Sequence, residues 1–111
     1  MTAMTSAEND MSPADARLLA EKPVYTVPRE MRAEYLARRR GELDALISSA
    51  KGNEWKYVIT IAHHVRGTGR MYGFDNIGDA AEELHKAIQN ADSNCYGFVE
   101  KYEKAVREAY V

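Results

Sequence analysis

The residues best suited to carry chemistry lie between positions 62 and 73, where the sequence reads Ala-His-His-Val-Arg-Gly-Thr-Gly-Arg-Met-Tyr-Gly. A neutral imidazole carries a free nitrogen lone pair near neutral pH, and such a nitrogen can attack phosphorus and hold a phosphoryl group. On a helical wheel His63 lies about 150° from the centre of the neighbouring apolar stripe. That stripe consists of Val58, Ile61, Ala62 and Val65. We therefore expect the His63 ring to face solvent.

Two neighbours of His63 strengthen this interpretation. A glycine inside a helix costs about 1 kcal/mol relative to alanine, and Gly67 lies one turn beyond His63 on the same face. The missing side chain would leave room for a large partner. Arg66 stands at the flank of the helix, and its guanidinium can fork onto a phosphoryl group. Thr60 shares the outer face, and His64 lies about 110° from the stripe.

The spacing of apolar residues predicts an all-helical chain. Positions at i, i+3, i+4 and i+7 indicate four long amphipathic helices, at about residues 28–49, 54–70, 75–91 and 95–109. We expect Pro28 to open the first of them and Asp75 to cap the third. Gly52 breaks the chain after the first long helix, and Gly69 and Gly73 are expected to loosen it after the second.

A shorter helix is predicted ahead of these four. Ser12 followed by Pro13 is typical of a helix start, so residues 12–20 are expected to be helical, and residues 1–11 to form a flexible tail. The four long helices have short connections and should be antiparallel neighbours. The fold class is therefore an up-down-up-down four-helix bundle with a short extra N-terminal helix, forming one domain over residues 12–111.

Composition excludes several classes of function. The net charge of −2 argues against a general nucleic-acid binder. The sequence contains no run of 18 or more apolar residues, so no membrane span is expected. A single cysteine cannot form an internal disulfide, and Cys95 is interpreted as a buried thiol on an apolar stripe. No secretion signal is visible. We expect a monomeric cytoplasmic protein.

The sequence around His63 resembles the histidine-containing phosphotransfer (HPt) family. That family has an exposed helical histidine followed by any residue, an aliphatic residue, a basic residue and glycine, usually then serine or threonine. A second glycine stands ten residues after the histidine. The matching residues are His63, His64, Val65, Arg66, Gly67, Thr68 and Gly73. The chain departs from the family in having arginine at 66, where lysine is most common, and in its doubled histidine.

The resemblance implies a role for each of these residues. His63 would accept the phosphoryl group, Arg66 would stabilise its charge, and Gly67 would provide clearance. The partner would be the receiver domain of a response regulator, a histidine kinase, or both. A receiver would bring the aspartate and the Mg²⁺, so this chain would need no cofactor of its own. Partner docking is expected to involve Thr60, His64, Arg70 and Gly73.

Other interpretations of the same residues remain. The bundle could bind and restrain a receiver without carrying phosphate, and an enzyme with His63 as general base is a third possibility, although no nucleophile accompanies it. A metal site at His63 and His64 is disfavoured because adjacent helical residues point about 100° apart. His85 is expected to be structural or solvated. Around Arg38, we expect a solvated charged face in which Glu34 and Glu42 pair with that arginine.

Overall fold

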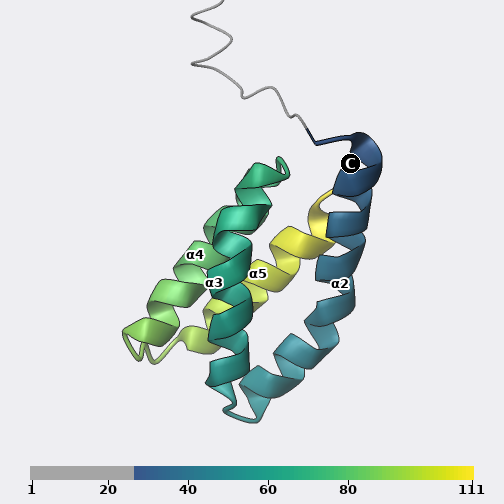
Figure 1. The fold of residues 1–111 in the computed structure, drawn as a ribbon. Coiled ribbons are helices and arrows are strands. Elements are labelled where there is room, and N and C mark those ends of the chain that lie inside the picture. Colours follow the sequence, from purple (N-terminus) through teal and green to yellow (C-terminus); the bar gives the residue numbers. More distant parts are fainter. Residues whose placement is uncertain (1–26) are drawn as a thin grey trace, which may run out of the picture.

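The computed structural model describes residues 27–111, which form four α-helices (Figure 1). These are α2 (Arg29–Lys51), α3 (Trp55–Met71), α4 (Asp75–Gln89) and α5 (Cys95–Glu108). Each boundary lies within two residues of the predicted one. No strand occurs in this part of the chain. The predicted tail and the predicted helix at residues 12–20 lie outside the described residues.

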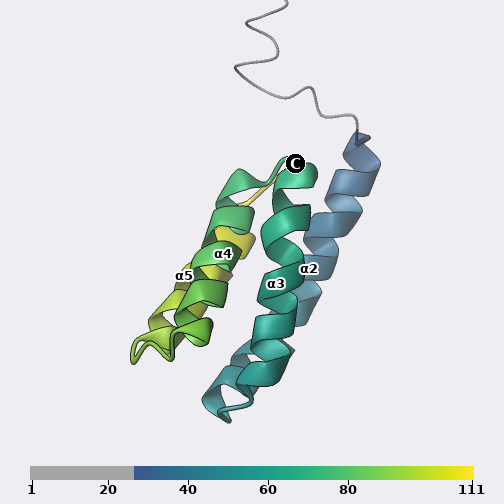
Figure 2. The ribbon, with the colours of Figure 1, turned by 60° about the vertical axis from the view of Figure 1, so that its left-hand side comes forward.

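The four helices run alternately in opposite directions, as the up-down-up-down prediction requires (Figures 1 and 2). Each helix packs against its neighbours in chain order, and α5 closes the ring by packing on α2. The α3–α4 pair has the most extensive contact, and α2–α3 has the least. The predicted four-helix bundle is confirmed. No helix of the described residues is long and apolar enough to cross a membrane.

Local residue types explain where most helices begin and end. Pro28 is the N-cap of α2 with φ −60° and ψ 153°, an extended conformation from which a helix starts readily. Gly73 has φ 86° in the turn between α3 and α4, a conformation that favours glycine. The prediction that Asp75 caps α4 was wrong, because the N-cap is Phe74 and Asp75 is the first helical residue. Its carboxylate still suits the positive end of the helix dipole.

The core lies on the axis of the bundle, where the four apolar stripes meet. Full burial of one such aliphatic side chain contributes about 1.5–3 kcal/mol. Ala91, the last residue of the helix predicted at 75–91, is not part of this core. It lies exposed in the turn after α4, with φ 51°. The larger fully buried side chains are Leu43, Leu46, Val58, Val65, Ile77, Leu84, Val99, Tyr102 and Val106.

One charged pair enters this core. Arg39 is only 4% exposed, and its guanidinium donates to the Glu42 carboxylate at 2.8 Å and lies 4.8 Å from the centre of the Tyr35 ring. The expected pairing of Glu42 with Arg38 was therefore wrong. Arg39 lies on the apolar stripe of α2 and is therefore buried, and Glu42, its partner, is partly buried. Arg38 remains exposed. The buried Tyr102 hydroxyl interacts electrostatically with both members of this pair but has no hydrogen-bond partner among the described residues.

The contact between α3 and α4 depends on two glycines. A Cβ atom placed on Gly69 would lie 2.9 Å from the backbone nitrogen of Gly78 and 3.1 Å from its Cα. No side chain fits there, so the two backbones approach more closely than larger residues would allow. Gly69 was expected to loosen the chain, and that expectation was wrong. It lies buried inside α3 and brings α4 close.

Candidate functional site

His63 lies on the exposed face of α3, as the wheel predicted. Its ring has one aromatic neighbour in the described part of the chain, the imidazole of His85 on α4. The two ring centroids are 5.4 Å apart, and the ring planes are inclined by 39°. A histidine pair thus spans the α3–α4 contact, with one ring in solvent and the other beneath it.

His85 is the functional-site neighbour that the sequence did not reveal. His85 is 5% exposed, and its Nδ1 atom is buried without a hydrogen-bond partner among the described residues. Burial lowers the pKa of His85, and the charges of Arg66 and His63 lower it further, while Glu82 opposes them. A neutral ring is therefore favoured. Of the two alternatives given for His85, structural or solvated, the structure excludes the solvated one.

Arg66 and Gly67 complete the surroundings of His63. Arg66 is half-buried, and its positive charge lowers the pKa of His85 on α4. Gly67 is exposed, and a Cβ atom built on it would meet nothing within 4 Å. The space beside His63 is therefore open, as the clearance interpretation requires.

Two of the predicted docking residues share this face of α3. Thr60 is exposed, and its hydroxyl donates to the Lys56 carbonyl at 2.8 Å. Arg70 is exposed but forms ion pairs with Asp79 and, at 3.4 Å, with Glu82. Hydrogen bonding to Asp79 raises the pKa of Arg70. Its charge is therefore largely balanced by carboxylates of α4 and offers less attraction to an acidic partner than the sequence suggested.

The other two predicted docking residues, His64 and Gly73, have different surroundings. His64 is exposed and lines a groove of about 230 Å³ between α2 and α3. In this groove the hydroxyls of Tyr35 and Thr68 are hydrogen-bonded at 2.7 Å. Gly73 lies in the turn after α3. Thr60, His63, His64, Gly67 and Arg70 are thus all exposed residues of α3, with His64 on the side that borders the α2–α3 groove, and Gly73 lies beyond the end of the helix.

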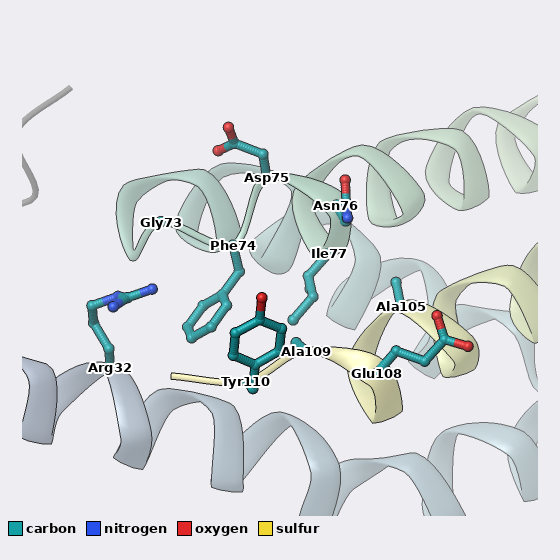
Figure 3. Close-up of a pocket in the computed structure, with 10 residues that line it drawn as sticks. All are labelled: Arg32, Gly73, Phe74, Asp75, Asn76, Ile77, Ala105, Glu108, Ala109 and Tyr110. Carbon is teal, nitrogen blue, oxygen red and sulfur yellow. The ribbon is translucent and has the colours of Figure 1, made fainter. Parts of the chain in front are cut away.

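A larger cavity opens at the end of the bundle near the C-terminus (Figure 3). It has a volume of about 420 Å³ and lies between the α3–α4 turn, the start of α2 and the residues after α5. Arg32 donates to the Tyr72 carbonyl at 2.8 Å and lies 5.0 Å from the Phe74 ring centre. None of His63, Arg66 and Gly67 lines this cavity. The histidine site is therefore separate from this cavity.

Within residues 27–111, no group of three or more histidine, cysteine, aspartate or glutamate side chains could hold a metal ion. Cys95 is half-buried, and its thiol donates to the Ala87 carbonyl at 3.4 Å. Burial raises the pKa of this thiol, so the thiolate that would bind a metal or act as a nucleophile is disfavoured. The chemistry available to these residues lies with the imidazoles.

Comparisons of the chain with protein-family models, with curated proteins and with solved structures find no match. A functional assignment therefore depends on the motif at residues 62–73 and on the geometry around His63.

Proposed function

We propose that this protein is a phosphoryl carrier of the histidine-containing phosphotransfer type, with His63 as the phosphoacceptor. The observation that carries the proposal is the open surface at His63. An exposed imidazole stands on a bundle helix, empty space lies one turn away at Gly67, and a cationic residue, Arg66, follows three positions along the same helix. A carrier needs such access, because its reaction partner is another protein.

The transfer needs few groups from this chain. A ring nitrogen of neutral His63 would attack the phosphorus of an aspartyl phosphate on a receiver domain. The P–N bond forms as the P–O bond breaks, and the aspartate leaves as a carboxylate. Positioning and charge stabilisation supply most of the rate in such transfers. Arg66 would contribute positive charge from this chain, and Mg²⁺ on the receiver would contribute the rest.

The same geometry suits a transient complex. The face with Thr60, His63 and Gly67 is exposed, and the helix it belongs to packs extensively against α4. A receiver approaching along it need not displace any part of the bundle. We expect the complex to bury about 1,600 Å² or less in total, as short-lived signalling encounters do.

The decisive experiment measures acid-labile phosphate on the protein. A receiver domain carrying labelled phosphoryl is mixed with the wild type, with His63→Gln and with His64→Gln, in the presence of Mg²⁺. Label should pass to the wild type and to His64→Gln but not to His63→Gln. Both substitutions are at exposed positions of α3, so folding should be equal and the second variant serves as the matched control.

Other outcomes would redirect the assignment. Label on His63→Gln and none on His64→Gln would move the acceptor to the adjacent residue. Saturable binding of a receiver to the wild type without any transfer would indicate the interaction module instead. A protein that neither binds nor accepts label from any receiver would contradict the proposal.

A further inference from the structure

The buried ring beneath His63 has no evident structural reason to be a histidine. Within residues 27–111, no side-chain hydrogen bond holds His85, and its Nδ1 is buried without a partner. Buried polar atoms in folded proteins nearly always have a partner, and one left without costs about 1–3 kcal/mol. A leucine would fill the same space without that cost. The imidazole therefore calls for a role outside packing.

His63 has a need that this ring can meet. A neutral imidazole has one nitrogen that carries hydrogen and one with a free lone pair, and only the second can attack phosphorus. The hydrogen bond made by the first nitrogen decides which of the two is free. Among residues 27–111, the ring contact of His63 is with His85 on the facing helix, whose imidazole can act in this way.

The separation of the rings suits a direct hydrogen bond. Each nitrogen lies about 1.2 Å from its ring centre, so a bond of about 2.9 Å between two imidazoles places their centroids about 5.3 Å apart. The observed separation is 5.4 Å. The two rings are not hydrogen-bonded in the structure, since Nδ1 of His85 has no partner among the described residues, so the exposed side chain of His63 must rotate to form the bond.

The charges around His85 keep it able to accept. Arg66 and His63 face it from α3, and Glu82 lies one turn earlier on its own helix. Glu82 is already shared between Arg70 at 3.4 Å and Lys86 at 3.6 Å, so its pull on a proton at His85 is weakened. Burial and the two α3 groups lower the pKa of His85. The neutral ring retains one lone pair as an acceptor.

From these observations we propose that His85 is a positioning residue for His63. Its buried Nδ1 accepts the ring N–H of His63 and thereby leaves the opposite nitrogen of His63 free towards solvent. This proposal rests on the phosphoryl-carrier function for its use. The pairing of the two rings is a property of the unmodified protein and can be tested without phosphate.

The first test is the tautomer of each histidine, read from ring nitrogen chemical shifts at a pH of about 8, where free imidazoles are neutral. His63 should show one dominant tautomer in the wild type. His64 provides an internal control in the same spectrum, because it is exposed on the same helix and has no ring contact with any described residue. In His85→Leu, the tautomer ratio of His63 should move to that of His64. In His85→Gln, whose amide oxygen can still accept, the dominant tautomer should persist.

The second test is the rate of phosphoryl acceptance from a labelled receiver. We expect His85→Leu to lower the rate about tenfold. This is the lower end of the effect of removing the hydrogen-bond partner that orients a metal-bound histidine, which serves as the analogy. His85→Gln should restore most of the rate. Melting curves monitor folding, and if His85→Leu fails to fold, the wild-type tautomer alone decides.

The two proposals fail in different ways. Equal tautomer ratios for His63 and His64 in the wild type would overturn the positioning role of His85, whatever the transfer assay shows. A single tautomer of His63 in a protein that accepts no phosphoryl group would support the ring pairing and remove the carrier function. An unchanged acceptance rate in folded His85→Leu would also contradict the positioning role.

Discussion

Two glycines of α3, only two residues apart, occupy opposite environments. Gly67 lies on the open face beside His63, where an added Cβ would meet nothing within 4 Å. Gly69 lies on the opposite side, where an added Cβ would lie 2.9 Å from the backbone of α4. Both cost the helix about 1 kcal/mol in propensity relative to alanine. Only at Gly69 is this cost offset by packing, because the close approach of α4 to α3 depends on the missing side chain.

The difference shows how the helix divides its tasks. The face towards α4 is constrained by backbone contact and holds His85 under His63. The outer face carries no packing requirement at Gly67, so the glycine there is best explained by something that approaches from outside. Stability should therefore be sensitive at position 69 and insensitive at 67, whereas partner access should be sensitive at 67.

The largest effect should come from Gly69→Leu. The added side chain would collide with backbone atoms of Gly78 that cannot move without separating α3 from α4. We expect a loss of about 3 kcal/mol or more in the free energy of unfolding, measured by urea denaturation. Gly67→Leu is the matched control, with unchanged or higher stability. Equal destabilisation by both substitutions would show that the two sites do not differ as the structure indicates.

A comparable contrast on α2 extends the comparison to charged residues. Arg39→Met would leave the Glu42 carboxylate without its partner, while the same change at exposed Arg38 removes no described ion pair. Breaking a buried pair costs about 3–5 kcal/mol, but Glu42 is 25% exposed, so about 2 kcal/mol is expected. Arg38→Met should remain within about 0.5 kcal/mol of the wild type. Denaturation midpoints of the two variants would compare them directly.

At Gly67, substitution should stabilise the fold and impair function. Gly67→Ala should raise the free energy of unfolding by about 1 kcal/mol, since alanine is the better helix former and the space is empty. The bulkier Gly67→Leu should remain folded and lose transfer from a phosphorylated receiver. The melting temperature and the transfer rate should be measured on the same samples. Full transfer by a folded leucine variant would remove clearance as the reason for this glycine.

The smallest effect concerns the pH dependence of stability. His85 has a lowered pKa in the folded protein, so the unfolded chain binds its proton more readily and stability falls as pH drops below about 6.5. Below the lowered pKa this loss is complete. His85→Leu should flatten the dependence in that range. The free energy of unfolding should be measured by urea denaturation at a series of pH values. If it depends on pH as steeply in His85→Leu as in the wild type, His85 is not the group responsible.

The sequence alone determined the helices and their order. Apolar residues at helical spacing marked α2, α3, α4 and α5, and short connections required antiparallel neighbours. The same periodicity placed His63 and Gly67 on the solvent side. These inferences succeeded because they depend on contacts between residues at most a few positions apart along the chain, which a helical wheel represents fully.

Only the tertiary structure decided which side chains meet across helices. The pairing of His63 with His85, the burial of Arg39 with Glu42 and the contact of Gly69 with Gly78 each depend on how two helices are rotated and how closely they approach. A wheel of one helix contains neither quantity. From the sequence, His85 was therefore expected to be structural or solvated, and Gly69 was expected to loosen the chain. The packing of α3 against α4 determines the environment of both residues.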